Sequence, residues 1–160
     1  MTRFLLTILL LIGTLGVVDI ASAATPEELT KQCQEGNAAA CSLLGLMYDL
    51  GSGVPQYPSK AVGLYRQACD GKDARGCFYL GWMYEDGEGV MQDQSKAAEF
   101  YRQACDGKVA MGCFNLGWMY EFGKGVRQSV EETLKFYGKA CDLKNEKGCA
   151  NHARLKTGKK

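Results

Sequence analysis

Residues 69–90 read CDGKDARGCFYLGWMYEDGEGV, and closely similar stretches occupy residues 33–54 and 105–126. The copies keep the same register without an insertion, with a period of 36 residues. All eight cysteines follow this period in two series, Cys33, Cys69, Cys105, Cys141 and Cys41, Cys77, Cys113, Cys149. A fixed period of this length indicates a solenoid of supersecondary units that bury their apolar faces against one another.

Each unit reads as two helices. In the first helix of the second unit, one face of a 3.6-residue period contains Cys77, Leu80, Gly81 and Tyr84. Glycine lowers helix propensity, so Gly81 predicts a place where a neighbouring helix comes too close for a methyl group. The glycine pair that begins at Gly87, repeated at Gly51 and Gly123, predicts the end of this helix.

The second helix of each unit is predicted to begin near a serine that caps its free amides, at Ser59, Ser95 or Ser129. Ser129 and Glu132 also fit the reciprocal capping box. The buried stripe of this helix in the first unit is predicted to consist of Ala61, Tyr65, Ala68 and Cys69. A glycine then ends the helix at Gly71 and Gly107, whereas Leu143 stands at the same point of the third unit.

The amino end has the order of a secretory signal. Arg3 precedes an apolar run from Phe4 to Val18, and the small residues Ala21-Ser22-Ala23 follow. The run is shorter than the roughly 20 residues that a membrane-spanning helix needs, although an uncleaved anchor is the alternative. We therefore predict a secreted or periplasmic protein with no stable membrane insertion after signal cleavage. The predicted parts begin with a signal peptide (1–23) and an N-terminal capping half-repeat (24–36). Three repeats follow (37–72, 73–108 and 109–144), and then a C-terminal capping helix (145–157) and a basic tail (158–160).

The repeat motif resembles a known family. Cys77-x-x-Leu80-Gly81-x-x-Tyr84-x-x-Gly87-x-Gly89-Val90, together with Ala104-Cys105-Asp106, is similar to the Sel-1-like repeats, which are relatives of the tetratricopeptide repeats. The resemblance is closer still to their cysteine-rich secreted branch, the Hcp family, which often carries the label beta-lactamase. It covers essentially the whole chain after the signal, and it implies an all-α, right-handed solenoid of helix-turn-helix repeats.

The cysteine spacing predicts local disulfides. Each pair has the spacing Cys-x7-Cys across a turn, where two antiparallel helices can bring the Cα atoms within disulfide range. The repeat allows only two regular pairings, and the longer-range one leaves Cys33 and Cys149 without a partner. We therefore predict Cys33–Cys41, Cys69–Cys77, Cys105–Cys113 and Cys141–Cys149.

A structural zinc site needs closer cysteines or a histidine pair, and the chain has the single histidine His152, so we predict no metal.

Catalytic residues cannot be assigned from the sequence. A penicillin-recognising serine enzyme needs Ser-x-x-Lys, which this chain lacks, and a Lys-Thr-Gly strand. Lys156-Thr157-Gly158 matches the second element, but it occurs at the end of the chain, where we expect no strand. We predict no cofactor and favour a non-enzyme. The alternative, a penicillin-binding protein with weak beta-lactamase activity, rests on the family resemblance alone, as does a beta-lactam or peptidoglycan-related ligand.

The resemblance to tetratricopeptide arrays implies a peptide groove lined by the first helices. Successive residues of a helix are about 100° apart around its axis. One flank of each first helix therefore contains the position two before its cysteine and the positions one, five and eight after it. With the bordering Asn115, this flank gives the predicted groove residues Arg75, Phe78, Trp82, Glu85, Met111, Phe114, Asn115, Trp118 and Glu121. Their counterparts in the first unit are Ala39, Ser42, Leu46 and Asp49.

These residues favour a peptide or protein partner with apolar and basic side chains. Two structural alternatives compete with this interpretation. Trp82 and Trp118 could instead pack between successive first helices, and the acidic series Asp49, Glu85 and Glu121 could accept hydrogen bonds from amides of the following glycine loops. The asparagine and lysine set of carboxylate-clamping relatives is missing, and a formal net charge of +1 gives no support for a nucleic-acid partner.

Overall fold

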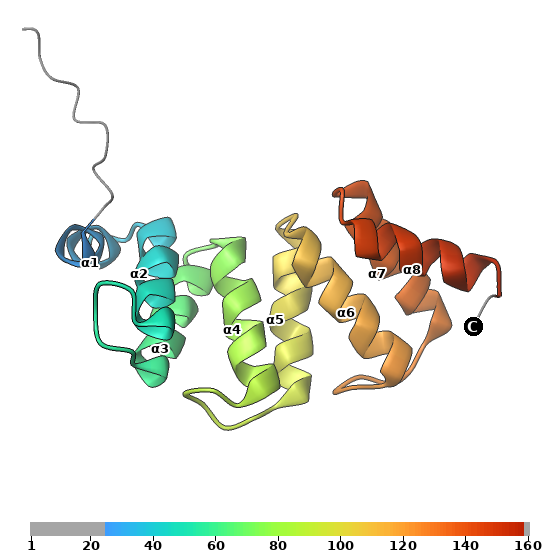
Figure 1. Ribbon diagram of the computed structural model, residues 1–160, viewed down its shortest axis with the longest axis horizontal. Coiled ribbons are helices and arrows are strands. Elements are labelled where there is room, and N and C mark those ends of the chain that lie inside the picture. Colours follow the sequence, from blue (N-terminus) through green and yellow to red (C-terminus); the bar gives the residue numbers. More distant parts are fainter. Residues whose placement is uncertain (1–24, 159–160) are drawn as a thin grey trace, which may run out of the picture.

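A computed structural model describes residues 25–158, and this part of the chain is all-helical (Figure 1). Its helices are α1 (Pro26–Gln34), α2 (Ala38–Leu50), α3 (Pro58–Asp70), α4 (Ala74–Asp86), α5 (Gln94–Asp106), α6 (Ala110–Phe122), α7 (Val130–Asp142) and α8 (Glu146–Lys156). The predicted signal, residues 1–23, lies outside the described residues. Among residues 25–158, no helix combines the length and apolar character that a membrane crossing requires.

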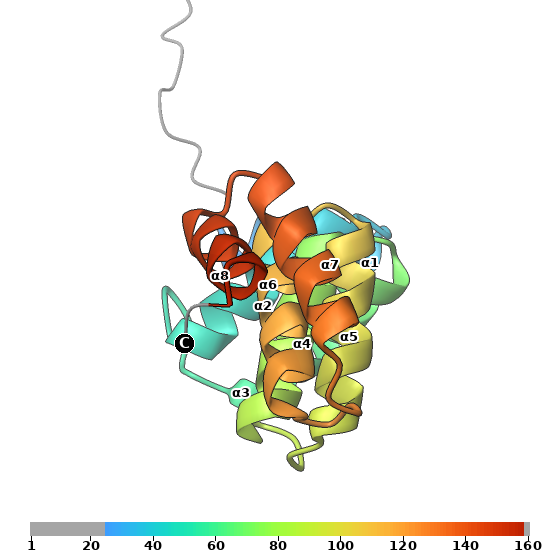
Figure 2. The same cartoon turned by 90° about the vertical axis from the view of Figure 1, so that its right-hand side faces the viewer.

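The helices stack as successive hairpins along one long axis. Each helix packs against the helices that precede and follow it in the chain, and α1 and α8 stand at opposite ends of the stack (Figures 1 and 2). This arrangement confirms the predicted all-α solenoid. Helices α2, α4, α6 and α8 are the first helices of their units, and α1, α3, α5 and α7 are the second helices.

The core runs between the first and second helices through the whole stack. Both predicted stripes are buried, in α4 as well as in α3. The largest side chains in this core are three tyrosines of the second helices, which are fully enclosed at Tyr65, Tyr101 and Tyr137. Each of these tyrosines packs against the glycine of the first helix in its own unit.

The helix glycines are required by close packing, as the sequence predicts. A Cβ atom built on Gly45, Gly81 or Gly117 would lie 2.7 to 2.8 Å from a ring carbon of the tyrosine in the paired helix. Such a distance is well below van der Waals contact. The neighbour that excludes the methyl group is therefore the tyrosine ring of the same unit, which enters the space that glycine leaves free.

Two kinds of helix end occur in each unit. Gly51, Gly87 and Gly123 end the first helices in the left-handed conformation, as predicted. At the end of the second helices Gly71 has an ordinary φ of −76°, and a Cβ atom there would lie 2.7 Å from that of Ala38. Gly71 is thus needed for close approach and not for its φ angle. The left-handed residue is the next one, which is a lysine at Lys72, Lys108 and Lys144.

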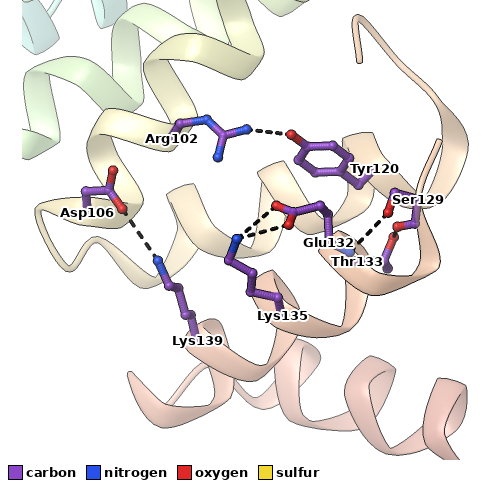
Figure 3. A network of polar contacts seen from close by, with 8 residues as sticks. All are labelled: Arg102, Asp106, Tyr120, Ser129, Glu132, Thr133, Lys135 and Lys139. Carbon is purple, nitrogen blue, oxygen red and sulfur yellow. Dashed lines mark hydrogen bonds and ion pairs between the residues drawn. The ribbon is translucent and has the colours of Figure 1, made fainter. Parts of the chain in front are cut away.

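The predicted serine caps are correct only in the third unit. The hydroxyl of Ser129 accepts a hydrogen bond from the backbone N–H of Glu132. The carboxylate of Glu132 pairs with Lys135 instead of the backbone of Ser129, so the reciprocal half of the capping box does not form (Figure 3). Ser59 and Ser95 are wrong as caps, because α3 begins at Pro58 and α5 at Gln94. The side chain of Asp93 caps α5, whereas α3 has no side-chain cap.

The four disulfides have the predicted local pairing. They join Cys33 to Cys41, Cys69 to Cys77, Cys105 to Cys113 and Cys141 to Cys149, with Cα–Cα distances from 4.4 to 4.8 Å. Each bridge connects the end of a second helix to the start of the following first helix. Every repeat is therefore covalently fastened to the next at one edge of the stack.

Candidate functional site

A solvent-open cavity of about 310 Å³ lies between α4 and α6, the first helices of two successive units. We call it the tryptophan cavity, and its lining residues are Trp82, Glu85, Asp86, Phe114, Asn115 and Trp118. All of these except Asp86 belong to the predicted groove. The aromatic and acidic parts of that prediction therefore meet in one concave place.

Both tryptophans keep part of their surface at the cavity. Trp82 is 37% exposed, and Trp118 is half-buried with its ring 5.2 Å from that of Phe122, measured between centroids. Phe114 lines the cavity with them and also packs against Tyr137, at a centroid distance of 5.5 Å. The cavity thus presents aromatic surface that the fold itself leaves uncovered.

The remaining predicted groove residues have other neighbours. Arg75 pairs with Asp73 at the start of α4, with 3.3 Å between Nε and Oδ1. Met111 is exposed at the start of α6, where the amide group of Asn145 lies 3.2 Å from its sulfur. Phe78 packs against the rings of Tyr79 and Tyr101. Glu121 of α6 lines a different pocket, together with Leu155 of α8, and none of these four residues lines the tryptophan cavity.

The acidic series accepts hydrogen bonds from buried tyrosines. The hydroxyls of Tyr65, Tyr101 and Tyr137 donate to the carboxylates of Asp49, Glu85 and Glu121, at 3.2, 2.5 and 2.7 Å. The alternative of loop amides as donors is therefore wrong, because no amide of the following loops donates to these three carboxylates in the described residues. Sequence reasoning missed these donors, although a tyrosine follows each acid at the same spacing of 16 residues.

Side-chain amides from the following loops bind the backbone of the same acidic residues. Gln56, Gln92 and Gln128 each donate from Nε2 to the carbonyl oxygen of the acid seven positions earlier, at 2.7 Å. These contacts hold the glycine loop against the end of the first helix. Each acidic residue is thus fixed at its backbone by a glutamine and at its side chain by a tyrosine.

Burial governs the titration of this network. It raises the pKa of Tyr65, Tyr101 and Tyr137 well above the usual range, and the facing carboxylates add to the effect. The tyrosines therefore remain protonated donors at physiological pH. Burial also raises the pKa of Asp49, which is 3% exposed, and the hydrogen bond from Tyr65 offsets this only in part.

Asp49→Asn is expected to raise the melting temperature near neutral pH. The pKa of Asp49 is higher in the folded than in the unfolded chain, so folding is favoured below the unfolded pKa and loses stability as pH rises through the folded pKa. Asparagine keeps an acceptor for Tyr65 and removes the buried charge. Thermal unfolding followed by circular dichroism should show a gain at about pH 7 that disappears at about pH 3.

Asp93→Asn is the matched control, with the opposite sign. The amide of Lys96 lowers the pKa of Asp93, so its ionised form is favoured in the fold and its contribution is lost as pH falls. This variant should lose stability near neutral pH. A gain that persists for Asp49→Asn in acid would show that the buried charge is not its cause.

The Lys156-Thr157-Gly158 match occurs at a helix end. Lys156 is the last residue of α8, and the hydroxyl of Thr157 donates to the carbonyl oxygens of Ala153 and Arg154. This segment does not form a strand, which agrees with the expectation from the sequence. Among residues 25–158, no group of three or more histidine, cysteine or acidic residues could hold a metal ion.

Comparisons with known proteins identify the repeat. The Sel1 repeat family matches residues 38–73, 74–109 and 110–145, each span beginning one residue after a predicted repeat boundary. No curated protein matches the chain.

Several solved structures are similar to the chain. The Helicobacter pylori cysteine-rich protein B is 30% identical over 81% of this chain and 98% of its own, with a TM-score of 0.64. A Sel1 repeat protein from Oxalobacter formigenes is 26% identical over 79% of this chain, with a TM-score of 0.72. The protective antigen c5321 of uropathogenic Escherichia coli is 29% identical over 77% of this chain, with a TM-score of 0.74. The chain spans 58% and 26% of the length of these last two proteins.

Proposed function

This chain belongs to the Sel1 repeat family, and from that premise we propose that it is an exported interaction module that binds a peptide or protein segment in the tryptophan cavity. Sel1 repeats generally serve as protein-interaction modules. Helix pairs that stack into a solenoid offer an extended concave surface to a partner. The cavity between α4 and α6 supplies such a surface here.

The single observation that carries the proposal is the uncovered aromatic surface of this cavity. Trp82, Phe114 and Trp118 line it together, and Glu85 and Asp86 border it with carboxylates. Tryptophans in a concave site are typical anchors of binding energy, because they bury large apolar areas with few rotatable bonds. The acidic border favours a partner segment that carries positive charge.

The disulfides support export. Disulfides persist in oxidising compartments such as the periplasm and the extracellular space, and glutathione keeps most cytosolic thiols reduced. The described residues contain four bridges and no free cysteine. Together with the signal-like amino end of the sequence, they favour a secreted or periplasmic location.

Trp82→Ala combined with Trp118→Ala is expected to abolish peptide binding. Loss of one anchoring tryptophan typically costs 2 kcal/mol or more, which is about 30-fold in affinity. The oxidised protein would be used to select peptides from a displayed random library. The affinity of the selected peptides for wild type and variant would then be measured by isothermal titration calorimetry.

Met91→Ala provides the control, because Met91 is 85% exposed and does not line the tryptophan cavity. It should leave the affinity unchanged. Circular dichroism and disulfide mapping would show that the double variant keeps its helices and bridges. Peptides that bind the folded double variant as tightly as the wild type would refute this binding site.

A further inference from the structure

The C-terminal helix α8 contains an arginine, Arg154, at the position that corresponds to Trp118 of the tryptophan cavity. Glu121 accepts a hydrogen bond from Tyr137 at Oε2 and a charged hydrogen bond from the guanidinium of Arg154 at Oε1. Arg154 belongs to α8, and its side chain is 35% exposed in this ion pair. Both carboxylate oxygens of Glu121 are therefore satisfied.

Glu85 has only the first of these two partners. Its Oε2 accepts the hydroxyl of Tyr101, and no donor among the described residues reaches its Oε1. Glu85 is followed by Asp86, which is exposed, and neither acid forms an ion pair within residues 25–158. The tryptophan cavity thus has two carboxylates with no cation of the described chain beside them.

The repeat relates the two places residue by residue. Glu121 stands 36 positions after Glu85, and Arg154 stands 36 positions after Trp118. The space between α6 and α8 therefore corresponds to the tryptophan cavity between α4 and α6. In the former, a guanidinium from the chain itself binds the acid. In the latter, a tryptophan replaces the arginine, and the acid has no ion-pair partner among the described residues.

We propose that the tryptophan cavity binds the guanidinium group of an arginine side chain in the partner, an inference that rests on the proposed function. A guanidinium is planar, stacks on aromatic faces and donates two hydrogen bonds to a carboxylate. The cavity offers the rings of Trp82 and Trp118 for stacking and the acids Glu85 and Asp86 for pairing. Tryptophan is the best aromatic partner for a cation. Within this fold, Arg154 pairs with Glu121 through one such hydrogen bond, from Nη2 to Oε1.

The test uses the peptide acetyl-Leu-Arg-Leu-amide and its analogue with citrulline, which has the shape of arginine without its charge. The two tryptophans of the chain both line the cavity, so tryptophan fluorescence reports binding there directly. The arginine peptide should give a saturable change, and the citrulline peptide should bind at least about tenfold more weakly. The difference should shrink at high salt, because salt screens exposed charges.

Glu85→Gln is expected to weaken the arginine peptide about tenfold and the citrulline peptide much less, because citrulline has no charge to pair with the acid. Glutamine keeps an oxygen acceptor for Tyr101, and circular dichroism would confirm the fold. Asp86→Asn is the second variant, because Asp86 is exposed and has no structural partner among the described side chains. Glu99→Gln makes the same charge change at an exposed position of α5, outside the cavity, and should have no effect.

The outcomes separate this inference from the proposed function. Equal binding of the arginine and citrulline peptides would overturn the guanidinium site and leave peptide binding in the cavity intact. The guanidinium site would also be overturned if the protein did not respond to the arginine peptide while binding of the library-selected peptides still depended on the two tryptophans. Selected peptides that ignore both tryptophans would contradict the binding site itself.

Discussion

Reduction of all four disulfides is expected to abolish the cooperative unfolding transition of this chain. Each bridge closes a ring of nine residues, which by the loop-entropy relation stabilises the fold by about 2.5 kcal/mol. The rings do not overlap, so their contributions should add to about 10 kcal/mol. That sum is comparable to the whole net stability of a small domain, about 5–15 kcal/mol. Urea titrations followed by circular dichroism, with and without a phosphine reductant, measure the effect.

A variant that lacks one bridge allows the contribution of a single disulfide to the free energy of unfolding to be measured. Cys105→Ala with Cys113→Ala should lower the free energy of unfolding by about 2.5 kcal/mol, because this bridge joins α5 to α6 in the middle of the stack. Cys33→Ala with Cys41→Ala is the matched control at the end of the stack. There α1 packs mainly on α2 and can fray alone, so the global transition should change less. Equal stability of the reduced and oxidised protein would refute a stabilising role for the bridges.

Tyr101→Ala is expected to lower the free energy of unfolding by about 3–5 kcal/mol. Tyr101 is fully buried, its ring fills the space above Gly81, and its hydroxyl donates to Glu85. Truncation would leave a cavity in the core and remove the donor. Tyr101→Phe keeps the ring and should cost about 1.5–3 kcal/mol, the usual contribution of a hydrogen bond to a charged group. Denaturant unfolding at neutral pH measures both values.

Tyr57→Ala is the control for tyrosine truncation, because Tyr57 is 57% exposed and stands before α3. Its effect should stay within about 0.5 kcal/mol, as for most surface substitutions. A loss for Tyr101→Ala no larger than that for Tyr57→Ala would contradict the role of this tyrosine. The same result would also remove the explanation given above for the helix glycine.

Much of the fold could be predicted because its signals are local. The cysteine period predicts the unit, the stripe that contains Leu80 and Gly81 predicts the first helix, and Gly87 predicts its end. Each disulfide joins residues eight positions apart, so the repeat leaves little choice of partner. The caps at Ser59 and Ser95 failed for a local reason too, since Pro58 and Asp93 offer earlier starting points for the same helices.

The candidate site could be predicted only in part. Helical periodicity places Trp82, Glu85 and Trp118 on one flank of the first helices, and in the structure these three residues line one cavity. The same periodicity assigns Arg75 and Met111 to that side. Both stand at helix starts, however, where Arg75 pairs with Asp73 and Met111 contacts Asn145. Periodicity describes direction around a helix axis. It does not say how close a residue stands to the turn at the helix end, or which residue of another helix lies beside it.

The sequence by itself determined the repeat, the helices and the four bridges, because these depend on spacing along the chain. Only the tertiary structure decided which groups meet across helices, including the tyrosine hydroxyls on the acidic series and Arg154 on Glu121. Such contacts depend on how closely the helices pack and on which rotamers that packing allows. For the same reason, only the stacked helices show that the carboxylate of Glu85 lines an open space.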